Sequence, residues 1–335
     1  MSTEAKPGRN TIAEVADRAR VSPTTVSHVL SGNRPVASAT RERVRKAIEE
    51  LGYRPSGLAR SLRLQRSETI ALIVPDIANP FYPALARGVD DELAGRYLTF
   101  LCNTDGQRER ELRFAADARD RRVDGLILAA FGVTDEDAAA LLDDGLPVVL
   151  LGQRLRGAPV DSVYTDDEHG GHEATRHLLE RGHRRIGLIS GREGPEGLRT
   201  TGHLRALAEA GLEIDPSLQI VGDWHRAGGT AAMRKLLDLA EPPTAVFAEN
   251  DLMAIGALDG ARERSLTVPG DLAIVGYDDI EAAQMTTPPL TTVINPAYEV
   301  GRQAARLLLD RMTGNYEGEA RVVALRAELV IRQSS

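Results

Sequence analysis

Eight short apolar segments place the strongest constraint on the fold of this chain. Four of them lie within residues 68–152, and four more within residues 184–296. Each is nearly continuous in apolar residues and is separated from the next by a helical stretch, which is the pattern of buried parallel strands joined by helices. The stretch VDSVYTDDEHGG (160–171) lies between the two series and is a natural crossing point. The sequence therefore predicts an α/β architecture of two tandem, doubly wound parallel-sheet subdomains.

Polar residues follow many of these strands directly, as Asn250 and Asp278 do. In an open parallel sheet, ligands bind beyond the carboxyl ends of the strands, so two such sheets facing each other predict a ligand cleft between them. The alternative is that these residues are helix N-caps, a position that suits Asp and Asn. We expect the N-cap role for Asp251 and Asp279, while for Asn250 and Asp278 the pattern alone leaves both roles open.

A small all-α segment is predicted before the first strand. Thr11 and Glu14 have the spacing of a capping box, so a helix should begin at Ile12. Ser22 is a good N-cap and Pro23 suits a first helical turn, so a second helix should follow. Such a pair predicts a helix-turn-helix headpiece, whose second helix lies in the DNA major groove. An ordinary helical hairpin with a polar outer face is the alternative.

A third helix is expected from Ser38 or Thr40, ending near Gly52. The segment SGLARSL that follows Pro55 is too short to be stable as an isolated helix. We therefore assign residues 10–55 to the headpiece and residues 56–66 to a hinge helix and linker.

Charge is distributed unevenly along the chain. Residues 1–66 contain 13 Lys and Arg against 6 Asp and Glu, a net of +7, whereas the other 269 residues contain 28 against 43, a net of −15. A basic head on an acidic body is expected of a DNA-binding module joined to a domain with another task. The single cysteine, Cys102, excludes an intrachain disulfide. Because no signal-peptide-like or membrane-spanning apolar stretch is found either, we expect a cytoplasmic protein.

A series of motifs covers nearly the whole chain in order: VSPTTVSHVLSG, TRERV, LGYRPSGLARSL, NPFY, RRVDGLIL, HLLERGHRRIGLISG, AENDLMAIGAL, VGYDDI and PPLTTV. Together they resemble the LacI/GalR family of bacterial transcriptional regulators. The resemblance implies a ligand-responsive, sequence-specific repressor that binds, as a homodimer, a pseudo-palindromic operator in double-stranded DNA. It implies no membrane partner. The effector implied is a small molecule, either a sugar or a similar small polar metabolite.

The resemblance also implies the division of the body. Residues 67–333 would form an effector-binding and dimerisation domain. Its N-subdomain would span about 67–164 and 294–321, and its C-subdomain about 165–293 and 322–333. No heptad tail follows, so a dimer is expected rather than a tetramer.

The family's DNA contacts fall on a defined set of positions. Because Pro23 replaces the usual hydroxyl or aromatic residue, base reading should rest on Thr24 and His28. Leu62 matches the residue that wedges between base steps in the minor groove. The positions implied are Ser22, Thr24, Thr25, Ser27, His28, Tyr53, Ala59, Arg60 and Leu62.

The family's effector pocket can be carried over in the same way. An aromatic face can stack on a sugar ring while amides, a carboxylate and an arginine bind its hydroxyls. For Trp224, burial in a core is the alternative. Gly152-Gln153 stand where many relatives have Asp-Arg, which removes a charged clamp. The positions implied are Asn79, Phe81, Tyr82, Arg199, Trp224, Asn250, Asp278 and Asn295.

None of the enzyme motifs considered fits this sequence. None of the three lysines follows a glycine, which excludes a Walker A loop, and no G-x-S-x-G elbow is present. We therefore expect no catalytic residues, no cofactor and no metal. The closely spaced His169, His172, Glu173 and His177 are a weak zinc candidate, since His177 resembles a family residue that contacts no metal. The alternative function is a cytoplasmic sugar-binding or sugar-processing protein without DNA binding, in which the basic head would have no use.

Overall fold

The computed structural model describes residues 10–31, 34–53, 66–129, 132–142, 145–152, 159–191 and 197–335. The chain divides into two compact units, Met1–Ser67 and Glu68–Ser335. In the described part of the chain, no helix is both long enough and apolar enough to cross a membrane.

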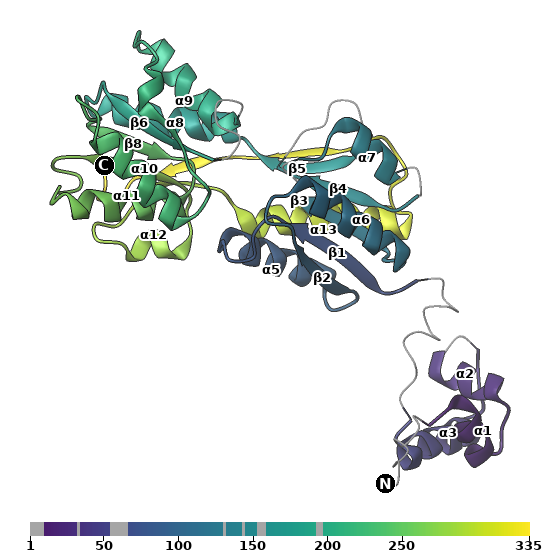
Figure 1. Cartoon of the computed structure of the whole chain (residues 1–335). Helices are drawn as coiled ribbons and strands as arrows, with labels where there is room; N and C mark the ends of the chain where they lie inside the picture. Colours follow the sequence, from purple (N-terminus) through teal and green to yellow (C-terminus); the bar gives the residue numbers. More distant parts are fainter. Residues whose placement is uncertain are drawn as a thin grey trace, which may run out of the picture. The chain divides into compact units, whose positions relative to one another are not determined.

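The described residues of the first unit form three helices, α1 (Ile12–Ala19), α2 (Pro23–Ser31) and α3 (Ser38–Leu51) (Figure 1). Their core is built on Val15, Val26 and Val44, which are fully buried. The predicted capping box is present at the start of α1, because the Thr11 hydroxyl accepts from the Glu14 N–H while the Glu14 carboxylate accepts from the Thr11 N–H at 2.6 Å. The predicted starts of the first two helices, at Ile12 and Pro23, are confirmed.

The turn between α1 and α2 has three residues. Arg20 adopts a left-handed backbone with φ of 54°, and its N–H caps the end of α1. The Ser22 hydroxyl accepts from the N–H of Thr25 at 3.1 Å and so caps α2. Within α2, Val26 is fully buried, whereas Leu30 is 39% exposed. The apolar face of α2 is narrower than its composition suggested.

The second unit begins with a six-stranded, fully parallel sheet in the order β11-β5-β4-β3-β1-β2. One face packs on α5 and α13, and the other packs on α6 and α7. The elements are β1 (Thr69–Val74), α5 (Phe81–Leu93), β2 (Leu98–Asn103), α6 (Arg108–Asp120), β3 (Gly125–Ala129), α7 (Asp135–Leu142), β4 (Val148–Leu151), β5 (Asp161–Thr165), α13 (Ala297–Thr313) and β11 (Val322–Leu325).

The second sheet also has six strands, in the order β12-β10-β9-β8-β6-β7, and only β12 is antiparallel to its neighbour. Helices α8 and α9 cover one face, and α10 and α11 cover the other (Figure 1). The elements are α8 (Asp167–Glu180), β6 (Ile186–Ser190), α9 (Leu198–Glu209), η2 (Pro216–Leu218), β7 (Gln219–Val221), α10 (Arg226–Leu237), β8 (Ala245–Ala248), α11 (Asp251–Glu263), β9 (Ala273–Asp278), α12 (Glu281–Met285), β10 (Thr291–Ile294) and β12 (Glu328–Val330). The predicted fold class, a helical headpiece followed by two α/β subdomains, is confirmed.

The chain passes between the two sheets at three places: after β5, after β10 and after β11. This corrects one predicted boundary. Residues 322–333 were assigned to the second subdomain, but Val322–Leu325 pair with Ser162–Thr165 in the first sheet. This edge strand alternates between exposed and half-buried residues, so it lacks the continuous apolar run that identified the other strands.

Three helix pairs, α5 with α13, α8 with α9 and α10 with α11, are brought together by glycines. In each pair a Cβ added to either glycine would overlap a backbone carbonyl oxygen of the facing helix, so the two backbones touch directly. The glycines are Gly88 and Gly301, Gly171 and Gly202, and Gly229 and Gly256.

Candidate functional site

The surface of α2 offers short hydrogen-bonding side chains and no carboxylate. Thr24 is exposed, and Ser27 and His28 are half-buried. Thr24 and His28 are four residues apart and therefore share one side of the helix. The hydroxyls of Ser22 and Thr25 bond each other at 3.0 Å, so they also shape the start of the helix.

The remaining predicted DNA contacts have different positions. Tyr53 packs against the core of the head, and its N–H donates to the Ile48 carbonyl at 3.0 Å. Ala59, Arg60 and Leu62 lie outside the described residues. The DNA contacts assigned to all of these positions stay predictions.

In the second unit, Arg199 lies at the start of α9, beside the ends of β8 and β9. Its Nε donates to Oδ1 of Asp167 at 3.0 Å, and its Nη1 donates to the carbonyl oxygen of Glu249. Its Nη2 lies 3.5 Å from Oδ1 of Asp278, and its side chain is 14% exposed. We call Asp167, Arg199, Glu249, Tyr277 and Asp278 the Arg199 cluster.

Two aromatic rings flank the guanidinium of Arg199. Its central carbon is 3.7 Å from the centroid of the Tyr277 ring and 5.9 Å from that of Trp224, which gives cation–π contacts. Trp224 has a left-handed backbone with φ of 71°, and a Cβ on Gly191 would overlap its ring. Trp224 is only half-buried, so it does not belong solely to a core.

A chain of buried hydrogen bonds leads from the Arg199 cluster to two of the crossing segments. Asn295 donates from Nδ2 to Oδ1 of Asp278 at 3.1 Å, and the Thr165 hydroxyl donates to Oδ1 of Asn295 at 2.7 Å. Thr165 ends β5 and Asn295 follows β10. The cluster is therefore bonded to backbone segments that pass from one sheet to the other.

Burial and charge set the protonation of this cluster. Burial raises the pKa of Asp278 to about 6, although the nearby Arg199 opposes the shift. Burial, reinforced by Asp278, raises the pKa of Asp251 well above its usual value. Burial would lower the pKa of Arg199, but Asp167 and Asp278 outweigh it and raise that pKa, so the guanidinium stays charged.

The N-cap of α11 is Asn250 rather than Asp251. Its Oδ1 accepts from the Met253 N–H at 2.8 Å, and its Nδ2 donates to the Trp224 carbonyl at 2.9 Å. Asp251 comes one residue later and points inward, accepting from the Ile280 N–H at 2.9 Å. The N-cap role expected for Asp251 is therefore wrong, and the effector role of Asn250 stays a prediction.

The N-cap role expected for Asp279 is wrong as well. Ile280 precedes α12 and provides no side-chain cap, while the Asp279 carboxylate pairs with Arg332 at 2.6 Å. Arg332 also donates to the Leu290 carbonyl, so Asp279 anchors the C-terminal segment instead.

The predicted effector residues divide between the two sheets. Asn79, Phe81 and Tyr82 lie between β1 and the first turn of α5, where Oδ1 of Asn79 accepts from the Phe81 N–H at 3.0 Å and the two rings meet edge to face at 5.1 Å. The other five follow strands or begin helices of the second sheet. Asp76, after β1, lies 3.6 Å from Nδ1 of His225, next to Trp224.

Sequence reasoning missed Asp167, Tyr277 and His225. Asp167 lies in the crossing stretch next to Asp166, and the sequence alone does not distinguish their roles. Tyr277 lies in an apolar strand and is typical of a core residue. His225 follows Trp224 and carried no motif of its own.

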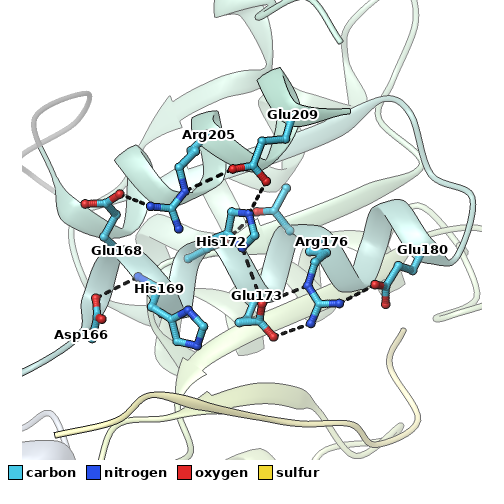
Figure 2. Close-up of polar contacts among 11 residues, drawn as sticks. Asp166, Glu168, His169, His172, Glu173, Arg176, Glu180, Arg205 and Glu209 are labelled. Atoms are coloured by element: carbon cyan, nitrogen blue, oxygen red, sulfur yellow. Dashed lines mark hydrogen bonds and ion pairs between the residues drawn. The ribbon is translucent and has the colours of Figure 1, made fainter. Parts of the chain in front are cut away.

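The zinc candidate on α8 belongs to an ion-pair network (Figure 2). Nε2 of His172 lies 2.7 Å from Oε2 of Glu209, and its Nδ1 lies 3.5 Å from Oε1 of Glu173, which Arg176 also binds. His177 bonds the Ser335 hydroxyl at 2.9 Å. Within the described ranges, no group of three or more His, Cys, Asp or Glu is placed to hold a metal ion.

Comparison with known proteins identifies two regions. Residues 11–56 match a model described as bacterial regulatory proteins, lacI family, and residues 175–335 match one described as a periplasmic binding protein-like domain. The chain is 36% identical to the HTH-type transcriptional repressor PurR of Aliivibrio salmonicida, over 97% of this chain and 98% of that protein.

Two solved structures also resemble the chain along almost its full length. The complex of the transcriptional regulator CelR with cellobiose is 37% identical, with a TM-score of 0.72, over 98% of this chain and 100% of that one. The lac repressor dimer bound to operator and the anti-inducer ONPF is 27% identical, with a TM-score of 0.86, over 98% of this chain and 99% of that one.

Proposed function

The chain belongs to the lacI family of bacterial regulatory proteins, and we propose that it is a homodimeric transcriptional repressor acting on a pseudo-palindromic operator in the cytoplasm. A sugar or similar small polar metabolite binds at the Arg199 cluster and changes the affinity for DNA. The observation that carries this proposal is that one chain joins a capped helix-turn-helix head to a buried Arg-carboxylate-aromatic cluster. The family is one of regulators, so the chain is not an enzyme.

Operator recognition rests on α2. Thr24 and His28 read base edges in the major groove. The DNA backbone is contacted by the residues that set the position of the helix, which are Ser22, Thr25, Ser27 and Tyr53. Ala59, Arg60 and Leu62 enter the minor groove at the operator centre, where Leu62 unstacks a base step at a cost of a few kcal/mol, offset by contacts with bent DNA.

Effector recognition uses residues of both sheets. Asn79, Phe81 and Tyr82 bind from the first sheet, and Arg199, Trp224, Asn250, Asp278 and Asn295 bind from the second. A ligand held by both groups favours one arrangement of the two sheets, and its differential affinity for the two arrangements changes DNA affinity. The bonds from Asp278 through Asn295 to Thr165 support this proposal, because they connect the ligand site to the crossing segments.

Selection of bound sequences from a random DNA library tests the function. We expect a pseudo-palindromic site bound about 10³-fold or more tightly than scrambled DNA. His28→Ala should cost about 1–3 kcal/mol on that site and relax the preference at particular base pairs. His169→Ala, an exposed histidine of the second unit, is the matched control and should bind as wild type does.

The outcomes separate the alternatives. If His28→Ala lost the same binding affinity on every DNA sequence, His28 would contact a phosphate rather than read a base. Equal binding of all sequences by the wild type would contradict the proposed function and would favour a sugar-binding protein without a DNA role.

A further inference from the structure

We infer that the effector is an uncharged polyhydroxylated molecule and that Asp167 is the residue that excludes anionic ligands such as sugar phosphates. The inference rests on the proposed function only in taking the Arg199 cluster as the effector site. It follows from which N–H groups and which charges the cluster has left to offer.

The first step is the charge of the cluster. The carboxylates of Asp167 and Asp278 face the single guanidinium of Arg199, at 3.0 Å from Nε and 3.5 Å from Nη2. Glu249 binds Nη1 through its backbone carbonyl, and its nearby carboxylate also helps to raise the pKa of Arg199. Glu249 is 1% exposed, and its two oxygens accept from the Thr200 hydroxyl and the Gly191 N–H, both at 2.6 Å. The positive charge is therefore already balanced, and an entering anion would meet uncompensated negative charge in a buried place.

The second step is geometry. Arginine binds phosphate or carboxylate strongly through two parallel N–H bonds from adjacent nitrogens. Asp167 occupies Nε, the Glu249 carbonyl occupies Nη1, and Asp278 faces Nη2. Nε carries a single N–H, so the fork of Nε and its neighbouring Nη is not available to an anion while Asp167 holds it. Nη1 and Nη2 each keep a second N–H, but the Asp278 carboxylate beside Nη2 opposes an anion there. A sugar can still donate a hydrogen bond from a hydroxyl to Asp278 and stack its ring on Trp224.

The chain has one tryptophan, and it lies 5.9 Å from the Arg199 guanidinium, so Trp224 emission reports on the cluster directly. The probes are inorganic phosphate, with chloride of equal ionic strength as a blank, and three pairs: cellobiose, glucose and ribose, each with its phosphate ester. We expect no saturable response of the full chain to inorganic phosphate. In any pair that binds, the uncharged sugar should bind at least about tenfold more tightly than its ester.

Substitution identifies the cause. Asp167→Asn keeps the side-chain shape and an oxygen that can accept from Nε of Arg199, but it removes one negative charge beside the guanidinium, and it should gain a saturable response to inorganic phosphate. Glu168→Gln is the matched control: it removes one negative charge at the next residue, which binds Arg205 instead (Figure 2), and it should gain none. Circular dichroism checks that both variants fold, and Asp278→Asn serves as a second variant, which removes the negative charge facing Nη2.

Two results would overturn the inference: a phosphate response of the wild type that Arg199→Gln removes, or folded Asp167→Asn and Asp278→Asn variants that both fail to gain one. Neither result depends on DNA. A chain without operator binding would therefore refute the proposed function while leaving the charge selectivity of the cluster measurable.

Discussion

Asp278, at the end of β9, has a backbone conformation that L residues rarely adopt and a buried environment that opposes the charge of its carboxylate. Its φ is 104°, it is 8% exposed, and burial raises its pKa to about 6 from the usual 3.8. The folded state therefore binds this proton more tightly than the unfolded state does. Its contribution to the free energy of unfolding falls as the pH rises from about 4 to about 6, and it stays low above that.

Asp278→Asn should therefore stabilise the free protein at neutral pH. Asparagine keeps the shape, tolerates a left-handed backbone and carries no charge. The gain in the free energy of unfolding should reach up to roughly 3 kcal/mol at pH 7.5 and vanish near pH 4. The response to the effector should be lost. Thermal unfolding at the two pH values measures it.

Asp271→Asn provides the control of opposite sign. Hydrogen bonds from Thr267 lower the pKa of this exposed carboxyl, so its contribution is present at neutral pH and is lost as the pH falls. Its replacement should lower the melting temperature at pH 7.5. A lower melting temperature for Asp278→Asn at that pH would contradict our account of Asp278.

Single residues of the site could be predicted only in part. Their positions after apolar strands made Asp278 and Asn250 candidates, since strand ends are where a parallel sheet binds ligands, and the family resemblance then favoured a ligand role for both. Whether Asn250 or Asp251 caps α11 depends on where the helix begins, and a shift of one residue exchanges the two roles. Asp167 and Tyr277 act through their contacts with Arg199, and contacts between distant segments carry no local signal.

Among the elements, the glycine contacts explain a motif that resembled a metal site. In the stretch EHGGHEATRH, a Cβ on Gly170 would overlap the Tyr277 hydroxyl, and one on Gly171 would overlap the Arg199 carbonyl. The stretch therefore provides a smooth helix surface on which α9 and β9 pack. This packing places Arg199 and Tyr277 against Asp167, at the first turn of the same helix α8.

Gly171→Ala should push α9 away from α8. Because the added methyl group meets backbone rather than a flexible side chain, the cost should be about 1–3 kcal/mol, measurable by chemical denaturation. Thr201→Ala, on an exposed position of α9, is the control and should change stability by less than about 0.5 kcal/mol. A Gly171→Ala variant as stable as the wild type would show that the two helices separate at no cost.

The predicted strands were those with continuous apolar runs, and all eight are strands in the structure. The burial expected of them is wrong for the edge strand β2, in which Leu98, Phe100 and Leu101 are 70%, 54% and 45% exposed. Four strands were not predicted. The chain's β7, β11 and β12 are short edge strands that are partly exposed. The buried β5 begins with Asp161, whose carboxylate is held by Arg311 and Arg321 at 2.8 and 2.9 Å. Its apolar run is interrupted by a residue whose partners lie about 150 residues away.

At the scale of the whole molecule, the uneven charge and the segment order predicted two units with different tasks, and the structure divides at Ser67. The sequence does not show how a ligand at one unit affects the other. The structure supplies a route within the second unit: the Arg199 cluster is bonded through Asn295 to Thr165, so it contacts two of the three segments that join the sheets.

Operator affinity measured with increasing sugar tests this account most directly. The full chain is titrated onto its selected operator by fluorescence anisotropy, at increasing concentrations of the uncharged sugar that saturates the Trp224 signal. We expect a change of at least about fivefold in operator affinity. Arg199→Gln should bind the operator as the wild type does without sugar and should show no change with it. An operator affinity that stays constant while Trp224 is saturated, or a response that survives in Arg199→Gln, would contradict the account.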